Sequence, residues 1–300
     1  LLFIGPAGAP EIYTGASGLQ DALSLPGPHT IFLRNGAYPL TRDIVIPDRW
    51  TIICDSSNVV LSPVNDYVHV IDLRGRATLS NVTVSIPAAC KSGIHIVGRQ
   101  AVVRQCWIQR LDAGDLPAVL FQDLVSGGRS TGASVIESTA FKTTSAPAVK
   151  ALVRRENGVV LGDLRSRAVD LAGPSGLLPD DSSAGDFGLS LVRCEIQKTN
   201  SLGTAMGDPD GYSAVVVLAG SVLLRDCTLH GLDSSVLYVG GPTMVDDAVT
   251  RSTLHAQSCV FLATPSSVVS NDNFFYTNPL TQQRSGDVSF TDCQWDVVIP

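Results

Sequence analysis

The chain has 300 residues, of which 44% are hydrophobic, 16% are charged and only 6% are aromatic. Its core must therefore consist mostly of Val, Leu, Ile and Ala side chains, a composition that favours β structure. The net charge of −7 and the scarcity of lysine argue against nucleic acid as a partner, because phosphate binding requires clustered Lys and Arg. No apolar run approaches the roughly eighteen residues that predict a membrane span.

Residues 1–29 are predicted to form an N-terminal segment that contains one short helix. Ser17-Gly18-Leu19-Gln20 has the spacing of a capping box, which places the start of this helix at Ser17. Leu19, Ala22 and Leu23 then give the helix an apolar face. Because an open β edge invites aggregation, we expect the helix to close the N-terminal end of the fold.

Short strands follow at residues 30–33, 44–46, 50–53 and 59–61, with the segment Asn35-Gly36-Ala37-Tyr38-Pro39-Leu40 among them. The order of helix, strand, Asn-Gly-Ala-Tyr-Pro-Leu and Ile-Val-Ile-Pro resembles the first coils of the pectin-lyase-like superfamily. As a fold signature the resemblance covers most of the chain, and it implies a right-handed parallel β-helix. The superfamily contains pectate lyases, polygalacturonases, pectin esterases, phage tailspikes and non-catalytic viral structural proteins, so the fold alone does not determine the function.

A six-residue pattern, apolar-x-polar-Cys-x-apolar, recurs from residue 79 onward. Its fourth position, which we call the slot, holds cysteine in five copies and Val, Thr or Leu in the other three. Successive slots are roughly 24 to 34 residues apart, as expected for a coil of three short strands with a loop of variable length. The eight slot residues are Val82, Cys106, Thr139, Leu164, Cys194, Cys227, Cys259 and Cys293.

A second family of short apolar strands precedes many copies of this pattern. Two strand families in a fixed order are expected in a solenoid and are hard to place in a sandwich or an α/β fold. We therefore predict an all-β chain in which residues 30–300 form one right-handed parallel β-helix. The strands of the second family are predicted at residues 93–97, 118–121, 148–152, 214–218, 235–239 and 267–269.

The seven cysteines include no C-x-x-C pair and no Cys/His cluster with the spacing of zinc ligands. Reduced cysteine packs as a small hydrophobic residue, so we expect the slot cysteines to fill an inward column. The residue before the slot is often Asn, Asp or Ser, which predicts a tight bend with left-handed backbone geometry.

Motifs typical of the enzymes in this superfamily are incomplete. Asp180-Asp181 and Asp246-Asp247 lie in predicted loops, without the Gly-His-Gly and Arg-Ile-Lys segments of polygalacturonases. Gln122-Asp123-Leu124 is only a fragment of the esterase pattern Gln-Asp-Thr-Leu. The acidic loop at residues 207–211 is the best candidate for calcium, but Asp-Pro-Asp-Gly is first of all a turn sequence. We therefore assign no catalytic, cofactor-binding or metal-binding residue and predict no cofactor.

The outward positions beside the slot contain no stacked pair of acids, which glycosidase chemistry would need. Instead the pattern predicts two cross-strand ion pairs, Arg104 with Glu137 and Arg165 with Glu195.

His95 alternates with Ile94 and Ile96, so we expect it to be an outward surface residue. The five histidines show no sequence context that would place them beside a serine nucleophile. Trp107 is also predicted to point outward, either as a sugar platform or packed beneath a loop or subunit.

Apolar residues at outward positions indicate an interface. Trp107, Ala140, Val192 and Val260 occupy such positions, and the mean hydropathy is +0.21. Residues 104–108 and 225–229 resemble strands of the cysteine-rich solenoid of the adenoviral large early transforming protein and its capsid relative. That resemblance implies a non-enzymatic virion protein, a capsid or tail component that assembles side by side as a homotrimer with other virion or surface proteins. The alternative is a tailspike-like polysaccharide lyase or glycoside hydrolase, virion-borne or secreted, that acts on an acidic or surface glycan.

Overall fold

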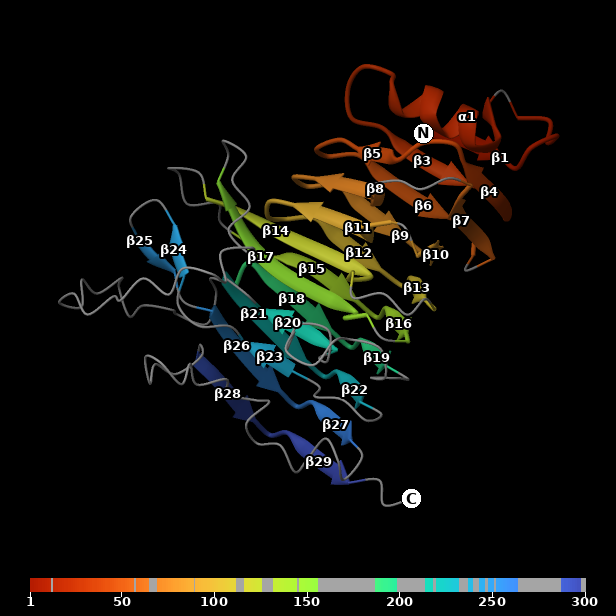
Figure 1. Cartoon of the computed structure of the whole chain (residues 1–300). Helices are drawn as coiled ribbons and strands as arrows, with labels where there is room; N and C mark the ends of the chain where they lie inside the picture. The colour runs from red at the N-terminus through yellow and green to blue at the C-terminus, as the bar shows by residue number, and fades with distance from the viewer. Residues whose placement is uncertain are drawn as a thin grey trace.

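The computed structural model is a long solenoid of short parallel strands (Figure 1). The helix lies at its N-terminal end, and the strands then stack coil upon coil toward the C-terminus. Within the described part of the chain, no helix is long and apolar enough to cross a membrane. The structure describes residues 1–11, 13–56, 58–64, 69–88, 90–111, 116–125, 132–144, 146–155, 187–198, 214–217, 220–231, 237–239, 243–245, 248–250, 252–263 and 287–297.

Three parallel sheets form the sides of the solenoid, and from residue 30 to residue 239 each coil contributes one strand to each sheet. The first sheet runs β2 (Tyr13–Thr14), β1 (Leu2–Gly5), β3 (Thr30–Leu33), β6 (Thr51–Cys54), β9 (Thr78–Ser80), β12 (Val102–Arg104), β15 (Ser134–Glu137), β18 (Leu189–Val192), β21 (Gly220–Arg225), β26 (Ser252–Gln257) and β28 (Asp287–Thr291).

The second sheet runs β4 (Gly36–Leu40), β7 (Val59–Pro63), β10 (Thr83–Ile86), β13 (Trp107–Arg110), β16 (Ala140–Thr143), β19 (Glu195–Lys198), β22 (Thr228–Gly231), β27 (Val260–Ala263) and β29 (Gln294–Val297). The third sheet runs β5 (Ile44–Ile46), β8 (His69–Arg74), β11 (Ser92–Val97), β14 (Val119–Val125), β17 (Val149–Arg155), β20 (Val215–Val217) and β23 (Leu237–Val239). Strands β24 (Thr243–Val245) and β25 (Ala248–Thr250) form a separate antiparallel pair.

This architecture confirms the predicted right-handed parallel β-helix with a short N-terminal helix. Alternation along each strand explains it, because every second residue is apolar and turns inward, as Ile94 and Ile96 do in β11. Equivalent inward residues of successive coils stack in register and form one continuous core. The predicted third-sheet strands near residues 93, 118, 148, 214 and 235 correspond to β11, β14, β17, β20 and β23. The strand predicted at residues 267–269 lies outside the described residues.

The slot forms the corner between the first and second sheets. The residue before it has a positive φ in every described coil, from 49° at Ser138 to 62° at Asn81. The prediction of left-handed geometry is therefore confirmed. This bend turns the next side chain inward, and the slot residues from Val82 to Cys259 are at most 4% exposed. All seven cysteines of the chain are free.

The helix α1 spans Gly15–Leu23, so the predicted capping box is wrong. Thr14 is the N-cap, it makes no side-chain cap bond, and Ser17 lies inside the helix. Gly18 packs against the backbone of Tyr13, where an added Cβ would lie 2.8 Å from the carbonyl carbon. Leu19 and Ala22 are fully buried, as predicted, and the helix covers the N-terminal end of the solenoid (Figure 1).

The fourth predicted copy, with Leu164 in its slot, is wrong as a coil of the stack. β15 pairs directly with β18 and β16 with β19, which leaves no coil between them. Residues 161–166 themselves lie outside the described residues. Glu195 is consequently in register with Ala140 and Thr228, not with Arg165.

The other predicted ion pair is also replaced. Arg104 and Glu137 are register neighbours, as expected. However, Glu137 pairs with Arg193, whose bend position brings its guanidinium back over β15, while Arg104 Nε donates to Ser80 Oγ at 3.3 Å. Val192, expected to contribute to an exposed apolar surface, is only 5% exposed, whereas Trp107 points outward as predicted and is 40% exposed.

Candidate functional site

A polar cluster occupies the outward face of the third sheet, where three neighbouring strands bring unlike side chains together. Asp72 in β8 lies between the inward residues Ile71 and Leu73, and it is in register with His95 in β11. Because each of these side chains alternates with buried apolar residues, the strand itself directs it outward.

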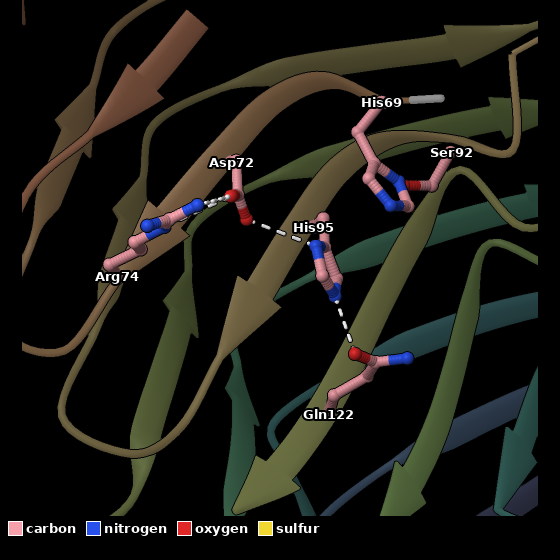
Figure 2. Close-up of polar contacts among 6 residues, drawn as sticks. All are labelled: His69, Asp72, Arg74, Ser92, His95 and Gln122. Atoms are coloured by element: carbon pink, nitrogen blue, oxygen red, sulfur yellow. Dashed lines mark hydrogen bonds and ion pairs between the residues drawn. The ribbon is translucent and has the colours of Figure 1, made fainter. Parts of the chain in front are cut away.

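His95 lies at the centre of this cluster (Figure 2). Its Nδ1 is 3.0 Å from Asp72 Oδ1, and its Nε2 is 2.8 Å from Oε1 of Gln122 in β14. The second carboxylate oxygen of Asp72 accepts from Nε and Nη2 of Arg74, both at 3.1 Å. Both nitrogens of His95 therefore lie within hydrogen-bonding distance of a side-chain oxygen.

His69, at the start of β8, adds a second imidazole. Its ring stacks on that of His95, with the ring centroids 4.1 Å apart and an angle of 23° between the planes. Its Nδ1 is 2.8 Å from Ser92 Oγ (Figure 2). Ser92 is fully buried, so its hydroxyl cannot attack a substrate and serves to orient the His69 ring. When Nδ1–H donates to Ser92, His69 Nε2 carries the lone pair.

Burial and charge set the protonation states in this cluster. Burial lowers the pKa of His69 to about 4, and the neighbouring charges of His95 and Lys91 act in the same direction. Burial alone would raise the pKa of Asp72, but the His95 ring and the Arg74 guanidinium outweigh it and hold that pKa below its usual value. At neutral pH the cluster therefore contains a carboxylate and a neutral His69 side by side.

The contact between Asp72 and His95 is close but poorly aligned. Asp72 Oδ1 and His95 Nδ1 are buried, and neither completes a hydrogen bond of normal angle with a described group. Buried polar atoms without a well-aligned hydrogen bond are uncommon, and they often mark functional sites.

A second ion pair lies in the C-terminal half of β14, where Asp123 binds Arg99. Arg99 binds Asp123 through both carboxylate oxygens, with the shortest contact 2.8 Å from Nη2 to Oδ2. Gly188 lies against this carboxylate, where an added Cβ would be 2.9 Å from Oδ2. Asp123 is thus held by Arg99, and its register partner in the next coil is Val153. The esterase-like fragment at residues 122–124 therefore does not assemble two carboxylates.

The structure corrects one expectation for histidine. His95 points outward as predicted, but it is only 6% exposed and is not a surface residue. His69 contacts Ser92 and His255 Nδ1 lies 2.6 Å from Ser289 Oγ, two contacts that the sequence did not predict, and the buried Ser92 is not placed as a nucleophile. The missed signal was the sequence of β8, which was not among the predicted strands and carries both His69 and Asp72.

Three acidic segments proposed from the sequence cannot be placed. They are residues 180–181, 207–211 and 246–247, and all lie outside the described residues. Among the residues that the structure does describe, no group of three or more His, Cys, Asp or Glu side chains is arranged to hold a metal ion.

Comparison with known proteins identifies the fold. Neither the family models nor the curated proteins include a match. Among solved structures, the chain is similar to ybhc of Escherichia coli, with a TM-score of 0.53 and 10% identity over 98% of this chain and 84% of that one. It is also similar to pectin methylesterase from carrot, with a TM-score of 0.52 and 9% identity over 99% of this chain and 83% of that one. These likenesses show the fold alone, a right-handed parallel β-helix.

Proposed function

We propose that this protein is a polysaccharide lyase that acts on an acidic glycan at the outward face of the third sheet. The observation that carries the proposal is the stacked pair His69 and His95, held by Ser92, Asp72 and Gln122. The fold does not need these polar groups on an outward face, and burying them has a free-energy cost, so a chemical role explains them.

His69 is the general base of the proposed reaction. Its ring is partly exposed and neutral at neutral pH, and its Nε2 carries the lone pair when Nδ1 donates to Ser92. In a lyase the base removes the proton at C5 of a uronic acid, the bond from C4 to the glycosidic oxygen then breaks, and that oxygen takes up a proton from water to leave as a hydroxyl group. The anionic substrate itself strengthens this base, because a nearby negative charge raises the pKa of an imidazole.

Arg74 fits the carboxylate of the uronic acid. The Arg74 side chain is 59% exposed, so its guanidinium can reach a ligand while it remains in contact with Asp72. Positive charge at the substrate carboxylate stabilises the carbanion that forms when the proton leaves. Asp72 in turn contacts both Arg74 and His95 and orients their side chains.

A lyase fits this cluster better than a glycoside hydrolase does. Hydrolases need two carboxyl groups about 5 to 9.5 Å apart, one of which must be a free nucleophile or base. Here Asp72 is bound by Arg74, and Asp123 is bound by Arg99. The carrot enzyme that shares the fold is named as a pectin methylesterase, which supports an acidic polysaccharide as the substrate class.

The test is incubation of the intact chain with a panel of uronic-acid polysaccharides that includes pectate, alginate and glycosaminoglycans. Elimination creates a C4–C5 double bond, so the product is detected by ultraviolet absorbance and by its mass. We expect an unsaturated product from at least one member of the panel. Shortened chains that are saturated would instead indicate hydrolysis, and no cleavage of any member would contradict the proposal.

A second candidate function is favoured by the exposed aromatic side chains. Trp107 is 40% exposed, and Phe290 and Trp295 in the last described coil are 36% and 48% exposed. We propose, as this alternative, a non-enzymatic virion capsid or tail component that self-associates side by side as a homotrimer. Sedimentation of the intact chain tests it, because a stable monomer at all concentrations would contradict this alternative.

A further inference from the structure

The outward face of the second sheet carries a compact patch around Trp107, on the neighbouring strands β10, β13 and β16 (Figure 1). Every second side chain of these strands is buried, so each strand presents two side chains outward. Because the strands are parallel and in register, the outward side chains form a grid of three strands by two positions. We call this grid the Trp107 patch: Thr83, Ser85, Trp107, Gln109, Ala140 and Lys142.

Trp107 is open to solvent because its register neighbours are small. It is 40% exposed, and its partners in β10 and β16 are Thr83 and Ala140. Neither side chain is large enough to cover an indole ring. Polar contacts also fix the ring, since Nε1 of Trp107 donates to Oε1 of Gln109 at 3.4 Å and Nε2 of Gln109 donates to Oγ of Ser85 at 3.4 Å. A ring and an amide that are already oriented lose little conformational freedom when a ligand binds.

Lys142 is the only charged residue of the Trp107 patch. It is in register with Gln109, so its side chain leaves the sheet beside that amide. The next strand adds Glu195, which is in register with Ala140. The Glu195 carboxylate lies 4.0 Å from Nε2 of His230 in β22, which directs it away from β16. The patch therefore has a positive charge on one side of its aromatic ring.

This combination fits a sugar ring better than a protein partner. A pyranose has an apolar face of C–H groups that can stack on an indole, and a rim of hydroxyl groups that need hydrogen-bond partners such as an amide and a serine. The patch measures about 10 Å across its three strands, which is enough for one or two sugar units. A standard protein interface covers about 800 Å² on each partner and has an apolar centre rich in aromatic residues, whereas the patch offers one aromatic ring.

We propose that the Trp107 patch binds an acidic glycan through one uronic acid unit, which stacks on Trp107 and directs its carboxylate to Lys142. The Cα atoms of these two residues are one strand and two positions apart, which is about 8 Å. The flexible lysine side chain can therefore bring its ammonium to the carboxylate at the edge of the stacked ring. The Gln109 amide lies between them and can bond a ring hydroxyl.

The Trp107 patch is separate from the cluster of His69 and His95. That cluster lies on the third sheet, whereas the patch lies on the second, so the two occupy different sides of the solenoid. The patch holds a glycan and performs no chemistry on it. Binding at Trp107 therefore does not depend on lyase activity.

The experiment is a titration of the intact chain with short oligomers of galacturonate and of mannuronate, followed by NMR at the indole N–H of Trp107. The chain has three tryptophans, and the signal that disappears in Trp107→Phe is the one to follow. This signal reports the patch even when an oligomer also occupies the third sheet. If the wild type cleaves the oligomer, His69→Asn takes its place. We expect a saturable shift with at least one oligomer, and a signal that no oligomer moves would overturn the proposal.

Two variants separate the ring from the charge. In calorimetry, Trp107→Ala should weaken binding at this site at least about tenfold, the scale of a lost aromatic contact. Lys142→Gln should weaken binding of the acidic oligomer by about threefold, the scale of an exposed ion pair, and should not affect its uncharged methyl ester. Val260→Ala is the matched control, because Val260 lies in the same outward column but outside the patch. Equal affinities of the wild type and Trp107→Ala would overturn the proposal.

The outcomes distinguish this site from the proposed lyase. Binding at Trp107 without cleavage of any oligomer supports the patch and contradicts the lyase. Cleavage with an unmoved Trp107 signal supports the lyase and overturns the patch. A Trp107 signal that shifts with protein concentration and with no oligomer would show that this face binds a second copy of the chain instead. Circular dichroism of each variant must show the β signal of the wild type.

Discussion

Two outward histidines of this solenoid lie beside an acid, and they differ in what surrounds them. On the third sheet His95 Nδ1 is 3.0 Å from Asp72 Oδ1, and the two side chains are 7% and 13% exposed. On the second sheet His230 Nε2 is 4.0 Å from Glu195 Oε1, and the side chains are 31% and 66% exposed. The strand pattern is the same in both places. The alternation thus determines the direction of a side chain, whereas its neighbours determine its burial.

The energetic consequences of the two pairs differ accordingly. An exposed pair contributes little, because water screens the charges and the side chains lose freedom when they pair. A buried pair matters more, since removal of one partner leaves an uncompensated charge in a poorly solvated place. The His95 cluster is therefore where substitutions should have large effects, and the His230 pair provides matched controls on the same fold.

The largest contrast is expected in catalysis. His69→Asn keeps an amide near Ser92 but removes Nε2, so lyase activity should fall by at least about a hundredfold, the usual contribution of a general base. His230→Asn should leave the rate unchanged. Initial rates of unsaturated product formation measure both. Full activity in His69→Asn would remove His69 from the mechanism.

Stability should show the next largest contrast. Asp72→Ala leaves Arg74 and His95 without their shared carboxylate, and we expect the free energy of unfolding to drop by about 3 kcal/mol. Glu195→Ala should change it by no more than about 0.5 kcal/mol. Urea denaturation of the two variants and the wild type gives these values. Similar losses in both variants would show that burial does not distinguish the two pairs.

The dependence of stability on pH should also differ between the third-sheet cluster and the His230 pair. The pKa of His69 is lowered to about 4 in the folded protein from an ordinary 6.5. Between these values the unfolded chain binds a proton that the folded chain does not, so the free energy of unfolding should fall as the pH drops from about 6.5 to about 4. Below about pH 4 His69 is protonated in both the folded and the unfolded chain, so it causes no further fall in the free energy of unfolding. The groups that face His69 are His95, Asp72 and Lys91.

His69→Asn should flatten this part of the stability profile, whereas His230→Asn should not. Thermal melting at a series of pH values measures the slope. An unchanged slope in His69→Asn would mean that another group causes the acid sensitivity.

The smallest effect on folding is expected at Trp107 on the second sheet. Its side chain is 40% exposed and its Nε1 lies 3.4 Å from Gln109 Oε1, so Trp107→Ser should alter the free energy of unfolding by about 0.5 kcal/mol or less. If this face takes part in assembly, the same variant should weaken self-association. Sedimentation at several concentrations separates the two properties, and identical behaviour of wild type and variant would exclude Trp107 from an interface.

The sequence by itself determined the features that depend on one strand or one bend. The six-residue pattern located the slot, and the residues before it predicted the left-handed geometry found at Asn81, Asp226 and their equivalents. Alternation predicted that His95 and Trp107 point outward. These features are local, because side-chain direction in a strand follows from the backbone period of two residues.

Only the tertiary structure decided which coils are neighbours. β15 pairs directly with β18, so Glu137 meets Arg193, and Glu195 lies in register with Ala140 and Thr228. The cluster of His69, Asp72, His95 and Gln122 likewise depends on the register of three strands whose connecting loops differ in length. Loop insertions change the sequence separation of stacked residues without changing the stack itself, so such neighbours cannot be counted along the chain.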